Sequence, residues 1–143
     1  MLRARRYRRV FIRHGLRGDS RAYLLRNDEI SLLTQDHSLV NELLATGSIT
    51  AEEAENHPRR NILTKALGVV PEQEPDIIEI KVFPDDMLLL CTDGFYQYFQ
   101  EEEIAGMLSE SSISLETKVE TMIQLALTRG GNDNITVVLA VNK

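Results

Sequence analysis

The sequence contains little cysteine and no long apolar run. Its single cysteine, Cys91, excludes an intramolecular disulfide and a cysteine-rich zinc cluster, and it fits a reducing compartment. The longest apolar runs, 87–91 and 137–141, are far shorter than the roughly 20 residues that a membrane-spanning helix needs. Because Cys91 lies inside the first run, we expect a buried hydrophobe rather than a reactive thiol. The 143 residues fit one cytoplasmic domain without a membrane span.

Acidic residues are absent from residues 1–17, which contain seven arginines. The whole chain carries −6, so removing the +7 of this segment leaves −13 on residues 18–143. Such an acidic body argues against nucleic-acid binding. The segment also lacks the apolar core of a secretory signal and the serines of a transit peptide.

Two interpretations of residues 1–17 stay open. Clustered arginines would attract the phosphates of nucleic acid or anionic lipid, as a basic arm does. The abrupt change to ordered alternation at Gly18 favours a segment with no functional role, produced by a gene-assignment error or a frameshift. We therefore divide the chain into an atypical arginine-rich segment, 1–17, and one structured part, 18–143.

Alternation and turn residues predict an antiparallel sheet covered by helices, which is an α+β fold. We expect strands at 21–26 and 29–33, at 77–82 and 87–91, and at 135–141. The first two pairs each flank a short turn, which is typical of hairpins. Helical spacing and capping residues predict helices at 38–45, from Thr50 to before Pro58, at 101–108 and at 115–127.

Three aspartates stand at predicted strand ends: Asp19, Asp93 and Asp133. The end of one antiparallel strand and the start of the next lie at the same edge of a sheet, so these carboxylates could converge there. Carboxylates are hard oxygen ligands that suit Mg²⁺ or Mn²⁺. Turn aspartates chosen for conformation alone remain the alternative, and no EF-hand string occurs.

Four sequence strings resemble protein phosphatase 2C, the metal-dependent serine/threonine phosphatases, and its bacterial members in particular. They occur in that family's order: Gly18-Asp19-Ser20-Arg21-Ala22-Tyr23, Leu33-Thr34-Gln35-Asp36-His37-Ser38, the run 88–94, and Gly131-Asn132-Asp133-Asn134-Ile135-Thr136. The resemblance covers about residues 18–142. It implies a portion of an α/β/β/α sandwich, with antiparallel sheets flanked by helices, and assigns this chain to the C-terminal half of the domain.

The resemblance also implies roles for individual residues. Asp93 and Asp133 match catalytic metal ligands, and Asp19 matches a ligand of an additional metal. Gly94 and Asn134 would flank the metal centre. Residues 36–68 match the flap, a segment that influences substrate choice, and three of its side chains are candidates for substrate contact: His57, Arg59 and Arg60. An ordinary solvated turn is the alternative for these three.

The implied reaction is dephosphorylation of phosphoserine and phosphothreonine proteins by a metal-activated water, with two or three Mn²⁺ or Mg²⁺ ions. A serine/threonine kinase would supply the phosphoprotein substrate. The family's phosphate-binding arginine, its metal-bridging Asp-Gly pair and a histidine near the leaving group have no match in this chain. We therefore expect a truncated form, impaired alone, with exposed sheet edges that favour a homo-oligomer or a swapped assembly. The alternative function is a non-catalytic pseudophosphatase or interaction module.

Overall fold

The computed structural model describes residues 8–14, 19–59, 62, 64 and 76–143. Its elements, in chain order, are β1 (Arg8–His14), β2 (Arg21–Arg26), β3 (Glu29–Leu32), α1 (Leu39–Ala45), α2 (Ala51–Glu55), β4 (Asp76–Val82), β5 (Met87–Cys91), α3 (Asp93–Tyr96), α4 (Glu101–Ser109), α5 (Leu115–Thr128) and β6 (Val137–Val141). No helix among these residues is long and apolar enough to cross a membrane.

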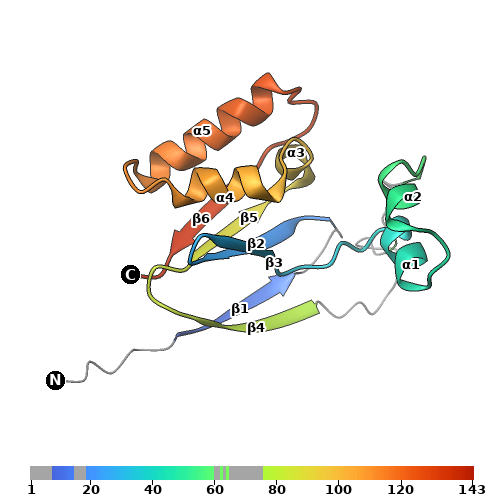
Figure 1. The fold of residues 1–143 in the computed structure, drawn as a ribbon, viewed down its shortest axis with the longest axis horizontal. Helices are drawn as coiled ribbons and strands as arrows, with labels where there is room; N and C mark the ends of the chain where they lie inside the picture. The colour runs from blue at the N-terminus through green and yellow to red at the C-terminus, as the bar shows by residue number, and fades with distance from the viewer. Residues whose placement is uncertain (1–7, 15–18, 60–61, 63, 65–75) are drawn as a thin grey trace.

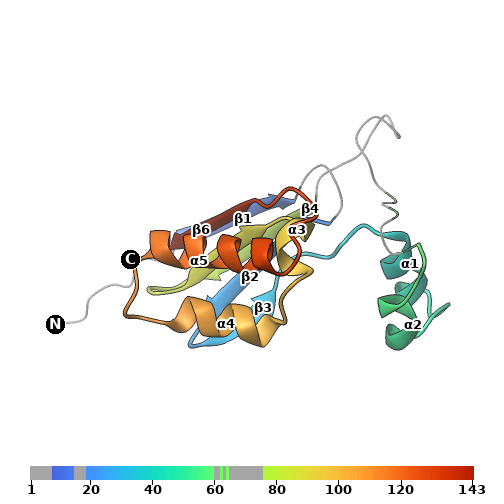
Figure 2. The same ribbon diagram turned by 90° about the horizontal axis from the view of Figure 1, so that it is seen from above.

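The strands form two antiparallel sheets. One has four strands in the order β3-β2-β5-β6, and the other pairs β1 with β4. Figures 1 and 2 show α4 and α5 on one face of the four-stranded sheet, with the β1–β4 pair on the side away from these helices. The α+β prediction, with antiparallel sheets flanked by helices, is confirmed for the part of the chain that the structure describes.

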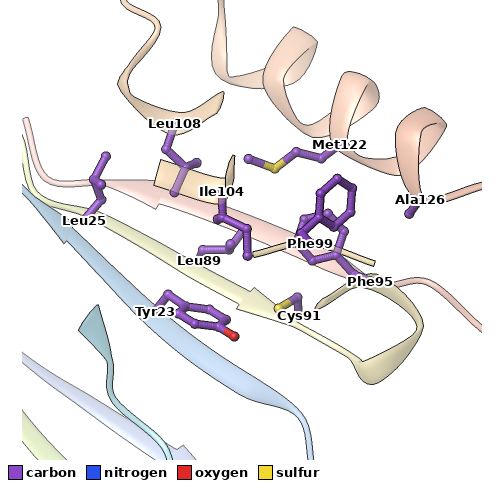
Figure 3. Packing of buried hydrophobic residues seen from close by; sticks show 10 residues of the cluster. All are labelled: Tyr23, Leu25, Leu89, Cys91, Phe95, Phe99, Ile104, Leu108, Met122 and Ala126. Atoms are coloured by element: carbon purple, nitrogen blue, oxygen red, sulfur yellow. The ribbon is translucent and has the colours of Figure 1, made fainter. Parts of the chain in front are cut away.

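The core lies between the four-stranded sheet and helices α3, α4 and α5, as Figure 3 shows. Its members are Tyr23, Leu25, Leu89, Cys91, Phe95, Phe99, Ile104, Leu108, Met122 and Ala126. Alternate residues of β2 and β5 face the helices because successive strand side chains point to opposite faces. Cys91 is buried in this core, as predicted, and its burial raises the pKa of the thiol to about 12.

Local signals placed most elements correctly. Asn27 and Asp28 both adopt positive φ, as the tight turn of the β2–β3 hairpin requires. The Ser38 hydroxyl caps α1, and Thr50 forms a reciprocal capping box with Glu53 at the start of α2. Because these side chains satisfy backbone N–H groups that a helix start leaves unpaired, both helices begin where the sequence predicts.

The predicted hairpin between 77–82 and 87–91 is wrong. Strand β4 pairs with β1, whereas β5 lies between β2 and β6 in the other sheet. The connection turns at Pro84 and Asp85. Asp86 follows the turn, and its carboxylate accepts the Phe83 N–H at 2.7 Å and binds Arg26 of β2 at 2.7 Å. These contacts fix the chain to the four-stranded sheet as it leaves β4, so the two consecutive strands belong to different sheets.

Part of the arginine-rich segment forms a strand that the sequence analysis did not predict. The backbone of β1 pairs with β4 over all seven residues, from Arg8 opposite Val82 to His14 opposite Asp76. The rest of residues 1–17 lies outside the described residues. The division of the chain at residue 18 therefore stays a prediction.

Candidate functional site

The junction between β5 and α3 is fastened to the segment that leads into β6. The Thr92 hydroxyl donates to the Asn134 carbonyl oxygen at 3.0 Å and accepts the Thr136 N–H at 3.1 Å. The Thr92 N–H also donates to the Thr136 carbonyl oxygen at 3.2 Å. Asp93 follows at once as the first residue of α3, a short helix that the sequence analysis did not predict.

Gly94 brings two of the predicted aspartates to neighbouring backbone segments. A Cβ built on Gly94 would lie 2.5 Å from the Asn134 carbonyl oxygen and 3.3 Å from the carbonyl carbon of Asp133. Only a residue without a side chain permits this approach. The Asp93 carboxylate accepts the Gly94 N–H at 2.8 Å, and the Asp133 carboxylate accepts the Asn134 N–H at 2.7 Å. Asp93 and Asp133 therefore lie at one edge of the sheet, each held by the next N–H.

Asp19 lies at the same edge, in the turn before β2. Register places Arg21 opposite Cys91, so the residues just outside these two positions, Asp19 and Asp93, lie at a common end of the strand pair. Burial raises the pKa of Asp19, and the negative charges of Asp93, Asp36 and Asp133 raise it further. We call Asp19, Asp93 and Asp133 the aspartate edge.

The predicted convergence is incomplete. Across the described residues, no three histidine, cysteine, aspartate or glutamate side chains are grouped closely enough to form a ready-made metal site. The donor chemistry nevertheless fits a hard divalent cation, because Asp19, Asp93 and Asp133 offer carboxylate oxygens at one edge of the sheet. Magnesium sites commonly use one or two carboxylates and complete their shell with water. Asp93 and Asp133 meet that requirement, with Asp19 within electrostatic range.

The flap candidates lie apart from the aspartate edge. His57 and Arg59 occupy the turn after α2, where the His57 Nδ1 accepts the Arg59 N–H at 3.1 Å. Figures 1 and 2 show α1 and α2 to one side of the sheets, beyond the end at which α3 lies. Arg60 lies outside the described residues. The role of all three in substrate contact stays a prediction.

Arg21 and Asp36 were not predicted as site residues, although each stands in one of the quoted strings. Arg21 donates to the Asp36 carboxylate from Nη2, at 2.8 Å, and from Nε, at 3.3 Å. Its Nη1 donates to the Tyr23 hydroxyl at 3.2 Å. Its guanidinium carbon lies 3.9 Å from the centroid of the Tyr96 ring in α3. Their place in strings that resemble the family could have marked both residues as candidates. The strings do not indicate that Arg21 and Asp36 form an ion pair with each other.

Comparison with known proteins identifies relatives of this chain. No family model matches the sequence. The serine/threonine phosphatase of Listeria innocua is 49% identical over 122 residues, which are 85% of this chain and 48% of that protein. A putative protein phosphatase 2C-type protein of Streptococcus pyogenes is 45% identical over 126 residues, 88% of this chain and 51% of that protein. The chain thus spans about half the length of the curated relatives it matches.

Solved structures give the same result. The Streptococcus agalactiae serine/threonine phosphatase superposes with a TM-score of 0.86 and 38% identity, covering 94% of this chain and 55% of that one. The catalytic domain of the serine/threonine protein phosphatase PstP, solved with two manganese ions, has a TM-score of 0.77 and 33% identity, covering 99% and 55%. Over the matched residues, this chain is therefore homologous to about half of a protein phosphatase 2C-type serine/threonine phosphatase.

Proposed function

We propose that this chain supplies part of the active site of a metal-dependent phosphatase that removes phosphate from phosphoserine and phosphothreonine in proteins. The observation that carries the proposal is the aspartate edge. The Gly94 contact with Asn134 joins the segments that carry Asp93 and Asp133. The pKa of Asp19 is raised by burial and by the negative charges of these two aspartates and Asp36. The phosphoprotein substrates would come from a serine/threonine kinase in the cytoplasm.

We assign Asp93 and Asp133 as the catalytic metal ligands and Asp19 as the ligand of an additional ion. Asn134 and Gly94 would hold the first two in place, since their N–H groups fix one oxygen of each carboxylate. His57, Arg59 and Arg60 belong to the proposal as substrate-binding residues.

Bound Mn²⁺ or Mg²⁺ lowers the pKa of water and neutralises charge on phosphoryl oxygens. This chain's residues then have two tasks. The carboxylates at the aspartate edge provide the negative charge that retains the cations. The hydrogen bonds of Thr92 keep β5 and the 134–136 segment at a fixed separation, so that Asp93 and Asp133 need not reorganise when the site is filled.

Manganese binding tests this proposal directly. We expect isothermal titration calorimetry of the chain to show Mn²⁺ binding, which weakens at least about tenfold in Asp93→Asn and in Asp133→Asn because each removes one charged ligand. Asp28→Asn, in the exposed β2–β3 turn, is the control and should leave the affinity unchanged. Affinity that is equal in wild type and in both edge variants would contradict the assignment. Manganese-dependent release of phosphate from a phosphothreonine peptide then tests catalysis.

A second function is favoured by one observation, the lack of a three-ligand group among the described residues. In that case the chain is a non-catalytic pseudophosphatase or interaction module that retains the scaffold. Metal stoichiometry separates the two functions. Two tightly bound ions per chain support the enzyme, whereas one weakly bound ion or none supports the module.

A further inference from the structure

The two helices beside the sheets form a small unit that closes on itself. We call residues 36–59, with Ile62 and Thr64, the α1–α2 unit. Its two ends are joined by backbone hydrogen bonds from Leu39 N–H to the Ile62 carbonyl, 2.9 Å, and from Thr64 N–H to the His37 carbonyl, 2.9 Å. Within the described residues, neither helix makes an extended contact with a helix or strand other than its partner. Figure 2 shows both helices projecting away from the layers.

The attachment of this unit to the sheet is narrow. Just before the unit, the chain is bound to β2, where the Ala22 N–H donates to the Thr34 hydroxyl at 3.1 Å and the Leu33 N–H donates to the Ala22 carbonyl at 2.8 Å. Two residues later stands Asp36. The Asn41 side chain of α1 donates to its carbonyl oxygen at 2.9 Å. Whatever fixes Asp36 therefore also fixes the start of α1.

Arg21 fixes Asp36. The ion pair between them is 2.8 Å long, with side-chain exposures of only 27% and 13%. A second donor of the same guanidinium, Nε, lies 3.2 Å from the other carboxylate oxygen, so the pair has the two-pronged geometry that specifies orientation as well as distance. The same guanidinium also stacks on the ring of Tyr96, which lies three residues after Asp93 in α3. One side chain thus links the α1–α2 unit to the helix that carries Asp93.

An open cavity of about 450 Å³ lies at this joint. Arg21, Leu32 and Thr34 line it on the side of the sheet, and Asn41 and Leu44 line it on the side of α1. Among the described residues, side chains do not fill the space between the unit and the sheet, so their packing does not set the angle between the two. We therefore expect the polar contacts of Asp36 with Arg21 and Asn41 to set this angle.

We propose that Arg21 is a positioning residue that holds the α1–α2 unit to β2 and α3 by binding Asp36 and stacking on Tyr96. The position matters for substrate access only if the proposed phosphatase function is correct, but the structural claim does not depend on it. Loss of the Arg21 side chain should make the unit unfold locally more often, because helices of seven and five residues do not persist in water without tertiary support.

Amide hydrogen exchange of the metal-free chain, followed by mass spectrometry, tests this. We expect Arg21→Ala to raise the exchange rate across 39–55 about tenfold relative to α4 and α5, the loss expected for one charge-assisted, partly buried contact. Asp36→Asn should do the same, and the double variant should add little to either change. Arg21→Lys should restore only part of the protection, because an ammonium cannot reproduce the planar fork and the stacking.

Arg26 provides a matched control on the same strand. It forms an equivalent pair with Asp86 at 2.7 Å and lies over the Phe83 ring at 4.5 Å, at the other end of β2. Arg26→Ala should leave exchange in 39–55 unchanged relative to α4 and α5. The proposal is overturned if Arg21→Ala leaves 39–55 as in wild type, or if the rise spreads equally over α4 and α5. Neither result bears on manganese binding, so the proposed function is tested separately.

Discussion

The backbone of Gly94 lies against the backbone of Asn134, with only 2.5 Å between a Cβ placed on the glycine and the Asn134 carbonyl oxygen. This contact joins helix α3 to the segment before β6, although Gly94 and Asn134 are 40 residues apart in the sequence. It also leaves no room for a methyl group. The closeness of Asp93 and Asp133 therefore depends on a residue that contributes no side chain.

Gly94→Ala should accordingly damage both stability and metal binding. Relief of the overlap requires the backbone at 133–134 to move, which we expect to cost about 2 kcal/mol of unfolding free energy. Urea denaturation measures the first effect, and calorimetric titration with Mn²⁺ measures the second. The control is Gly106→Ala in α4, where the added Cβ meets nothing within 4 Å apart from its chain neighbours and the backbone of its own helix. Because alanine favours helix, this control should gain about 0.5–1 kcal/mol. If both variants had the same unfolding free energy and the same manganese affinity, the contact between Gly94 and Asn134 would not be needed for either property.

Asp19→Asn should change stability and metal affinity in opposite directions. Burial and neighbouring carboxylates raise the pKa of Asp19, so its ionised form opposes folding at neutral pH. That cost is absent at pH values below the ordinary range of aspartate and develops as the pH rises through the raised pKa. We expect the asparagine variant to gain about 0.5 kcal/mol at pH 7, after allowance for solvent screening, and to lose manganese affinity. A loss of stability at pH 7 would contradict the electrostatic interpretation.

The ion pair of Arg26 with Asp86 predicts a loss of stability in acid. The Arg26 guanidinium holds the pKa of Asp86 below its ordinary value, against the opposing effect of burial. The stabilisation is therefore complete above the ordinary aspartate pKa of about 4 and disappears as the pH falls through the lowered value. Asp86→Asn should cost about 2 kcal/mol at pH 7, and the difference from wild type should shrink toward pH 2. Urea titrations at several pH values check this, and a difference independent of pH would exclude the mechanism.

Lys118 ties α5 to the end of α4. Only 3% of the residue is exposed, and its ammonium donates to the carbonyl oxygen of Leu108 in the last turn of α4. Lys118→Ala removes this donor and the packing of the aliphatic stem, so we expect a loss of about 2 kcal/mol in thermal or urea unfolding. Lys81→Ala, an exposed lysine on β4, should change stability by less than about 0.5 kcal/mol. Similar losses in both variants would count against the capping role.

Local chemistry was sufficient to predict most elements. The positive φ at Asn27 and Asp28 and the caps at Ser38 and Thr50 are properties of a few neighbouring residues, and the structure has them where the sequence indicates. The pairing of strands is not local. Strand β4 pairs with β1, more than 60 residues away, although the turn beside Asp86 resembles a hairpin turn. Alternation fixes which side chains share a face, but it does not choose between partner strands.

The candidate site shows the same division. The positions of Asp19, Asp93 and Asp133 at strand ends follow from strand boundaries, and the family resemblance gives them a role. Their approach depends on the Gly94 contact and the Thr92 hydroxyl, which are tertiary features. The pair of Arg21 with Asp36 was missed because 15 residues and a strand separate its members, and charge alone does not pair them.

The self-closed α1–α2 unit has a consequence for how such chains diversify. Hydrogen bonds between its own ends retain the unit's shape, and the large core lies elsewhere, between the four-stranded sheet and α3, α4 and α5. Substitutions at the exposed positions of α1 and α2, away from the buried Val40 and Ala54, therefore escape the packing constraints that limit change in the core. The outer surface of the unit can therefore change in sequence without a change in Arg21 of β2 or Tyr96 of α3, the residues that attach the unit to the rest of the fold.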